Sequence, residues 1–215
     1  ASENLKKQEG SYDDLYFNYG LNYDLRDSPY RPTSGYKTSF YQTLPVISDN
    51  QEIQNTFTAT KYKTLNETSG MVGMASLYLS SVHTLSNSND VRISKRANIP
   101  YNRLRGFERN KIGPIDNDDY IGGNYVTTLN FATNLPGLFP TVENVDLSYF
   151  VDFANIWGVD YSSAIDESNV IRSSTGISLD LLTAVGPLSF SWTAPITQKS
   201  TDKTETFRFN LGTTF

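Results

Sequence analysis

The chain repeatedly alternates apolar and polar residues, and this alternation restricts its fold more than any other feature of the sequence. Near its end, the apolar positions of one such run are Leu188, Phe190, Trp192, Ala194 and Ile196, with mostly polar residues between them. A period of two places successive side chains on opposite faces of a β-strand. The same alternation over residues 15–25, 145–154 and 207–215 predicts three more strands.

Further strands are predicted from runs that alternate less regularly. These runs cover residues 36–46, 53–65, 72–84, 125–134 and 171–183. No segment has the 3.6-residue periodicity of a convincing amphipathic helix. The sequence therefore predicts an all-β fold, an antiparallel arrangement of about nine strands.

The distribution of apolar residues favours a membrane protein that crosses with strands. No apolar run approaches the roughly 18 residues that a spanning helix requires, which excludes a helical membrane protein. A transmembrane β-strand needs only about 10 residues and is apolar on one face, so the mean hydropathy of −0.42 does not argue against a barrel. Aromatic residues are plentiful, with 14 Tyr, 12 Phe and 2 Trp. We expect the apolar face to meet lipid and the polar face to line a hydrated lumen, the polar positions being Ser189, Ser191, Thr193, Arg208, Asn210 and Thr214.

The predicted connections alternate roughly by length, as they do in outer-membrane barrels, where periplasmic turns are short and outer loops are long. If the C-terminus is periplasmic, the short turns cover residues 184–187, 135–144, 66–70 and 27–35. The outer loops then include residues 158–170 and the very long segment 85–121. A soluble β-sandwich would also give alternating strands and turns. Because nine strands would leave two edges unpaired, we expect the remaining strands of a closed barrel to come from outside this sequence.

Composition and local motifs give no support for catalysis, metal binding or nucleic-acid binding. The net charge of −5 argues against a nucleic-acid partner, and the absence of cysteine removes disulfides and Cys-zinc sites. Residues 116–119 resemble the start of a calcium loop, but Ile121 stands where that loop requires glycine. His83 lies near Ser80 and Ser81, and sequence proximity alone does not make a catalytic triad. We therefore expect no catalytic residues, no cofactor and no enzymatic activity.

The long predicted loop is rich in basic residues, which we expect to meet the anionic head groups of membrane lipid. They are Arg92, Lys95, Arg96, Arg103, Arg105, Arg109 and Lys111.

Several motifs together resemble one family. Leu104-Arg105-Gly106-Phe107 lies in the longest loop and is followed by Gly113-Pro114 and Gly122-Gly123-Asn124. Residues 150–157, 172–176, 186–188 and 207–215 follow in the family's order, and Tyr23-Asp24, Pro32-Thr33 and Gly35 resemble an earlier unit. With these motifs, nearly the whole chain resembles the BamA-type family of outer-membrane insertases and related transporters. Asn130 departs from it, since the family commonly has an acidic residue there, and Ala154 stands where glycine is usual.

The resemblance implies an architecture and a site. The family's barrel has sixteen strands, so residues 1–215 would supply strands eight to sixteen, the C-terminal half of a transmembrane barrel. Its long loop, about residues 85–121, would fold back into the lumen. Arg105 would there pair with Asp152 in a charge-assisted, bidentate contact, while Gly106 would allow a tight backbone and Phe107 would pack at the loop tip.

The resemblance also implies a function for the terminal strand. Its residues Phe207, Phe209, Leu211, Gly212 and Phe215 would lie at a weak seam that opens sideways and templates an incoming strand by main-chain hydrogen bonds, with Gly212 allowing the strand to bend. The chain would thus be the core component of the machinery that folds and inserts β-barrel proteins into the bacterial outer membrane. Its partners would be unfolded outer-membrane β-barrel clients, periplasmic chaperones, accessory lipoproteins and outer-membrane lipid. The alternatives are a polypeptide-secretion conduit of the same superfamily, or a simple pore or surface antigen.

Overall fold

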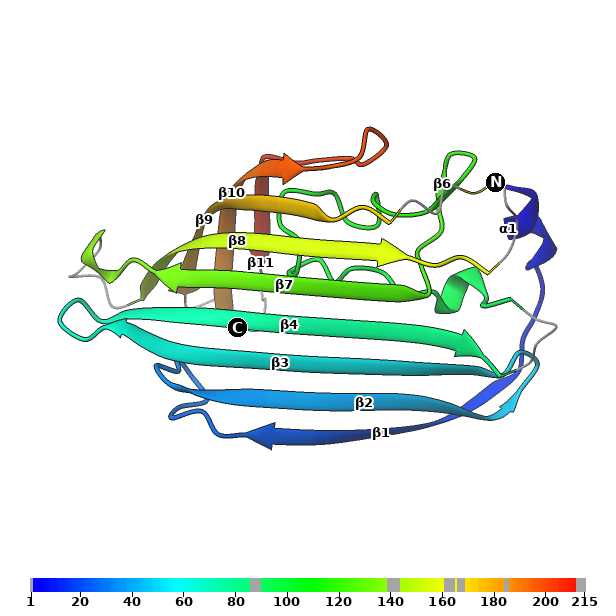
Figure 1. Ribbon diagram of the computed structural model, residues 1–215, viewed down its shortest axis with the longest axis horizontal. Helices are drawn as coiled ribbons and strands as arrows, with labels where there is room; N and C mark the ends of the chain where they lie inside the picture. The colour runs from blue at the N-terminus through cyan, green and yellow to red at the C-terminus, as the bar shows by residue number, and fades with distance from the viewer. Residues whose placement is uncertain are drawn as a thin grey trace.

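The computed structural model describes residues 2–85, 90–138, 144–160, 165, 169–183 and 186–211. Nine strands of these residues form one antiparallel sheet (Figure 1). The strands pair in chain order, without a crossover. They are β1 (Asp14–Asp24), β2 (Gly35–Ser48), β3 (Glu52–Asn66), β4 (Met71–Thr84), β7 (Tyr125–Asn134), β8 (Val145–Trp157), β9 (Arg172–Thr183), β10 (Gly186–Thr197) and β11 (Phe207–Leu211). The predicted all-β antiparallel fold with nine main strands is confirmed.

Short elements complete the described part of the chain. A two-stranded hairpin, β5 (Ile115–Asp116) and β6 (Asp119–Tyr120), lies within the long segment between β4 and β7. The helix α1 (Glu3–Lys7) begins where the Ser2 hydroxyl accepts a hydrogen bond from the Leu5 amide, and η1 (Ile93–Lys95) and η2 (Pro136–Leu138) are single turns. No helix among these residues combines the length and the apolar character that crossing a membrane would require.

The connections of the sheet divide between its two ends. β1, β3, β7 and β9 end at one end of the sheet, where the β3–β4 turn is at the left of Figure 1, whereas α1 and the β5–β6 hairpin are at the right. β4, β8 and β10 end at this second end. The expected alternation by length is incomplete there, because only residues 49–51 join β2 to β3.

The two faces of the sheet differ as the alternation predicted. Large apolar side chains remain exposed on one face, which we call the outer face, among them Leu15, Phe17, Leu21, Trp192 and Phe209 at 45–66% exposure. On the opposite, inner face, polar side chains are buried, including Ser76, Thr128, Asn130, Asp152 and Ser174.

The inner face is packed where the long segment covers it. Ala97, Ile99, Leu104, Phe107 and Ile112 of that segment form one apolar cluster with Val126, Ala154 and Ile156 of the sheet. Ser191 and Thr193, expected in a hydrated lumen, are 4% and 9% exposed. For these two positions the expectation of a hydrated surface is wrong, because a folded loop occupies the space beside them.

Candidate functional site on the inner face of the sheet

The site is built on a row of polar residues that the strand register aligns. Across five strands, Thr60, Ser76, Asn130, Asp152 and Ser174 stand opposite one another in turn. Hydrogen bonds join neighbours in this polar row. The hydroxyls of Thr60 and Ser76 lie 2.8 Å apart, and the Asn130 amide donates to Asp152 Oδ1 at 2.9 Å. The long loop forms hydrogen bonds with several members of this row.

Arg105 binds the centre of this row. Its Nε donates to Asp152 Oδ2 and its Nη2 to Asp152 Oδ1, both at 2.8 Å, and its backbone amide reaches Oδ2 at 3.2 Å. Asp152 is fully buried, while the Arg105 side chain is 18% exposed. The structure therefore places the two residues in a bidentate pair, the strongest geometry for a guanidinium and a carboxylate.

Asn130 completes the surroundings of Asp152. Its Nδ2 donates to the carbonyl of Arg103 at 2.6 Å as well as to Asp152, and its Oδ1 accepts from Thr128 at 3.2 Å. A carboxylate at position 130 would face Asp152 with a like charge, whereas the amide supplies a donor. Asn130, at the position where the resemblance led us to expect an acidic residue, thus gives Asp152 a neutral partner besides Arg105.

The ring of Phe150 packs against the Arg105 guanidinium. The Arg105 Cζ lies 3.4 Å from the centre of the Phe150 ring, a cation–π contact. Phe150 fits there because Gly176 has no side chain, since a Cβ at 176 would lie 2.9 Å from the Phe150 ring and 2.1 Å from the Trp192 carbonyl. The absence of a side chain at Gly176 thus leaves room for the Phe150 ring, which in turn contacts Arg105.

The residues after Arg105 carry the loop to the terminal strands. Gly106 has φ 88°, and its missing side chain leaves room for Thr193, which a Cβ would approach to 3.2 Å. The Gly106 carbonyl accepts from the Glu205 amide at 3.0 Å. Arg208 on β11 donates to the carbonyl of Phe107 at 2.6 Å and also to that of Tyr101. The loop is therefore tied both to the wall at β8 and to the last described strand.

The residues expected at a seam lie partly within the described chain. Phe207, Phe209 and Leu211 point to the outer face with 48%, 50% and 62% exposure, and β11 pairs with β10 at five positions. Phe209 packs against Phe190, with ring centres 5.1 Å apart. Gly212 and Phe215 lie outside the described residues.

Most basic residues of the long loop face the protein. The expectation that they would meet lipid head groups is therefore wrong for them. Arg92 and Arg96 are each 5% exposed. Arg92 contacts Asp14 at 2.7 Å and Glu52 at 2.9 Å. Arg103 donates to Ser76 of the polar row at 2.5 Å. The expectation failed because carboxylates and hydroxyls distant in sequence lie opposite these side chains in the fold.

The Asp160 carboxyl responds to one of these loop contacts. Burial opposes ionisation of its carboxyl, but the Val91 amide at 2.9 Å and the Arg96 guanidinium at 2.5 Å outweigh burial and hold the Asp160 pKa below its ordinary value.

The sequence reasoning missed a further buried ion pair, between Arg172 and Asp202. Arg172 begins the segment 172–176 that resembles the family. It donates to both carboxylate oxygens of Asp202 at 2.9 and 3.0 Å, and the two side chains are 1% and 0% exposed. Thirty residues separate them in the chain. No local pattern signals the pair, since Asp202 lies in an irregular connection.

Two features considered for other chemistry have structural contacts. Asp116 and Asp119 lie in the β5–β6 hairpin and accept hydrogen bonds from Asn4 and from the Ser2 amide. The imidazole of His83 meets the Tyr125 ring edge-on at 5.2 Å, and Tyr125 stacks on Trp157 at 5.5 Å. This aromatic group at the long-loop end of the sheet is typical of the girdles of membrane barrels.

Comparisons with known proteins agree with this architecture. The family model described as the Omp85 superfamily domain matches residues 1–215. The chain is 32% identical over 143 residues to the outer membrane protein assembly factor BamA of Neisseria meningitidis serogroup B, which covers 52% of this chain and 17% of that protein. It is 26% identical over 117 residues to BamA of Neorickettsia risticii, covering 53% of this chain and 16% of that protein. The crystal structure of BamA from Haemophilus ducreyi lacking POTRA domains 1–3 superposes with a TM-score of 0.80 and 26% identity, over 90% of this chain and 41% of that one.

Proposed function

Because the chain belongs to the Omp85 superfamily, we propose that it forms part of an outer-membrane β-barrel that folds and inserts other β-barrel proteins into that membrane. The observation that carries the proposal is the loop fixed to the sheet by the bidentate Arg105–Asp152 contact. A simple pore would need an open interior, whereas here the loop packs apolar residues against β7 and β8.

The proposed mechanism uses the terminal strand as a template. In the described sheet β11 lies at an edge, next to β10 on one side, and a strand edge offers unpaired N–H and C=O groups. An incoming client strand would pair with such an edge through main-chain hydrogen bonds. No covalent bond changes in this step, so we propose a protein that is not an enzyme and whose energy source is client folding.

The inward loop would set how firmly that edge is held. Arg208 joins β11 to the carbonyls of the loop, and the loop is joined to β8 through Arg105. Loosening the Arg105–Asp152 pair would therefore weaken the support of β11 as well. Unfolded barrel clients are the primary proposed partners, with periplasmic chaperones and accessory lipoproteins delivering them.

Client insertion by the full-length parent protein in lipid vesicles tests the function. We expect Arg105→Ala to slow client folding, measured by the change in gel mobility that folded barrels show without heating. Arg31→Ala, which removes an exposed ion pair with Asp146, serves as the control and should insert clients at the normal rate. Transport of a soluble polypeptide into the vesicles, without client insertion, would instead identify a secretion conduit.

Crosslinking tests the templating step separately. Residues 1–215 contain no cysteine. Leu211→Cys would therefore introduce the single thiol of this segment, at the β11 edge. We expect a disulfide between this position and a cysteine in the last strand of a stalled client. Leu79→Cys, on the outer face of the internal strand β4, is the matched control. Equal crosslinking at both positions would contradict templating.

A further inference from the structure

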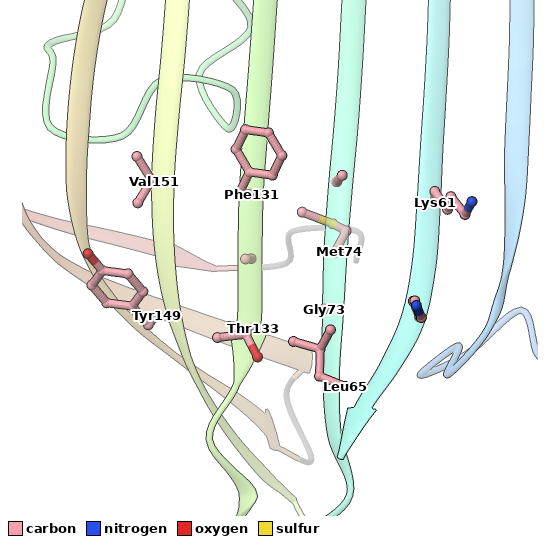
Figure 2. A pocket seen from close by; sticks show the side chains of 11 residues that line it. Lys61, Leu65, Gly73, Met74, Phe131, Thr133, Tyr149 and Val151 are labelled. Carbon is pink, nitrogen blue, oxygen red and sulfur yellow. The ribbon is translucent and has the colours of Figure 1, made fainter. Parts of the chain in front are cut away.

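A hollow on the outer face of the sheet is not explained by the proposed insertion mechanism. It has a volume of about 390 Å³ and lies over β3, β4, β7 and β8 (Figure 2). Small-molecule sites occupy roughly 300–1,000 Å³, so this hollow has the size of a ligand site. Because the outer face meets lipid in the proposed function, the occupant must come from the membrane.

Two rows of the strand register build this outer hollow. In one row Lys63, Gly73, Thr133 and Tyr149 stand opposite one another, and in the next Lys61, Ala75, Phe131 and Val151 do so. Gly73 and Ala75 form the floor because their side chains are absent or small. Figure 2 shows Lys61 on one side of the hollow and Tyr149 and Val151 on the other.

The floor is apolar and partly shaped by Leu65. A Cβ at position 73 would lie 3.0–3.2 Å from three carbons of the Leu65 side chain, which therefore rests over the glycine. Leu65 is itself 57% exposed. An elongated apolar group, such as an acyl chain, would find hydrocarbon contacts along this floor.

The two lysines give one wall a positive charge. Both Lys61 and Lys63 are exposed, and within the described residues neither has a carboxylate at ion-pair distance. Cationic side chains on the lipid face destabilise a barrel near the middle of the bilayer and are tolerated near its surface. Lys63 lies three residues before the end of β3, roughly 10 Å along the strand, and a lysine stem extends its ammonium toward the surface.

We propose that this outer hollow binds an anionic phospholipid of the leaflet at the short-turn end, with an acyl chain over Gly73 and Ala75 and the phosphate at Lys61 and Lys63. The proposal rests on the membrane placement of the sheet in the proposed function. Charge complementarity favours a lipid with a net negative head group, because two unpaired ammonium groups adjoin an apolar floor. A bound lipid of this kind would fix the barrel's depth beside the β3–β4 turn.

Native mass spectrometry of the full-length parent protein in detergent tests the site, with dioleoylphosphatidylglycerol as probe and dioleoylphosphatidylcholine as the zwitterionic comparison. We expect Lys61→Gln with Lys63→Gln to lower the affinity for the phosphatidylglycerol about tenfold, since each basic side chain near an anionic surface contributes about fivefold at most. The matched control is Lys6→Gln with Lys7→Gln on α1, which changes the same charge at the opposite end of the sheet and should leave the affinity unchanged.

A second pair of variants tests the apolar floor. Ala75→Leu on β4 fills the hollow and should reduce retention of both lipids. Ala59→Leu, on the outer face of β3 but outside the hollow, should not. Equal binding of the two lipids by the unaltered protein, or unchanged binding in the lysine variant, would mean general annular lipid and overturn the proposal. Competition by inorganic phosphate alone, with no effect of Ala75→Leu, would also overturn it. If the unaltered protein bound the anionic lipid as expected but inserted no client, the proposed function would be refuted and the lipid site would stand.

Discussion

Replacing Arg105 with alanine is expected to destabilise the barrel because it strands a buried carboxylate. Asp152 is 0% exposed and accepts from two side-chain nitrogens of Arg105, from its backbone amide and from Asn130. In Arg105→Ala only the last two donors remain. Removing one partner of a buried ion pair costs about 3–5 kcal/mol, and the remaining donors favour the lower limit, about 3 kcal/mol.

The reciprocal change should cost less. In Asp152→Ala the Arg105 guanidinium stays over the Phe150 ring and, being 18% exposed, regains contact with water. We expect a loss of about 2 kcal/mol, the range for hydrogen bonds to charged groups. The double variant should lose about 3 kcal/mol, so the coupling free energy between the two positions is about 2 kcal/mol.

Urea-induced unfolding of the full-length parent protein in lipid vesicles measures these free energies, provided that the slopes of the transitions agree among the variants. Arg31 and Asp146 provide a control cycle, since their contact is 2.7 Å long but the side chains are 43% and 45% exposed. Their coupling should not exceed about 1 kcal/mol. Additive losses for Arg105 and Asp152, or equal couplings in the two cycles, would refute the reasoning.

Three further changes test other parts of the structure. Gly106→Ala should lower the unfolding free energy by about 1–3 kcal/mol in the same assay, because φ is 88° and the new Cβ would crowd Thr193. The loss should exceed that of Gly70→Ala, where φ is 69° but the space around the residue is open. Equal losses in the two variants would rule out a contribution from crowding against Thr193. Arg172→Ala should lower the unfolding free energy by about 3–5 kcal/mol, because the Asp202 carboxylate stays buried without its partner. Arg172→Lys should restore only part of this loss, since lysine cannot form the bidentate contact. A loss under about 1 kcal/mol in Arg172→Ala would contradict a buried pair. The Asp27 pKa is lowered to about 2, chiefly by the hydrogen bond from the Thr33 hydroxyl. The stabilisation of the β1–β2 turn by the Asp27 carboxylate should therefore be complete above about pH 4 and disappear as the pH falls through 2. NMR of the turn amides measures this titration, which Asp27→Asn should abolish.

The sequence by itself determined the strands and the character of their faces. Alternation is a local property, since a period of two depends only on neighbouring residues, and it identified the apolar series through Leu15 and Phe17 that the structure leaves exposed. The motif around Arg105 also carried the expectation of contact with Asp152. That expectation came from resemblance to a family and not from spacing, because 47 residues separate the two positions.

Only the tertiary structure decided which residues meet across strands. The polar row from Thr60 to Ser174 and the two rows of the outer hollow depend on register, and a shift of one residue would turn every side chain of a strand to the other face. The partners of Arg92 and Arg172 depend on the path of long connections, for which sequence offers no periodic signal. Local patterns fix what each strand presents, whereas the partners follow from hydrogen bonding between segments far apart in the chain, a property of the whole sheet.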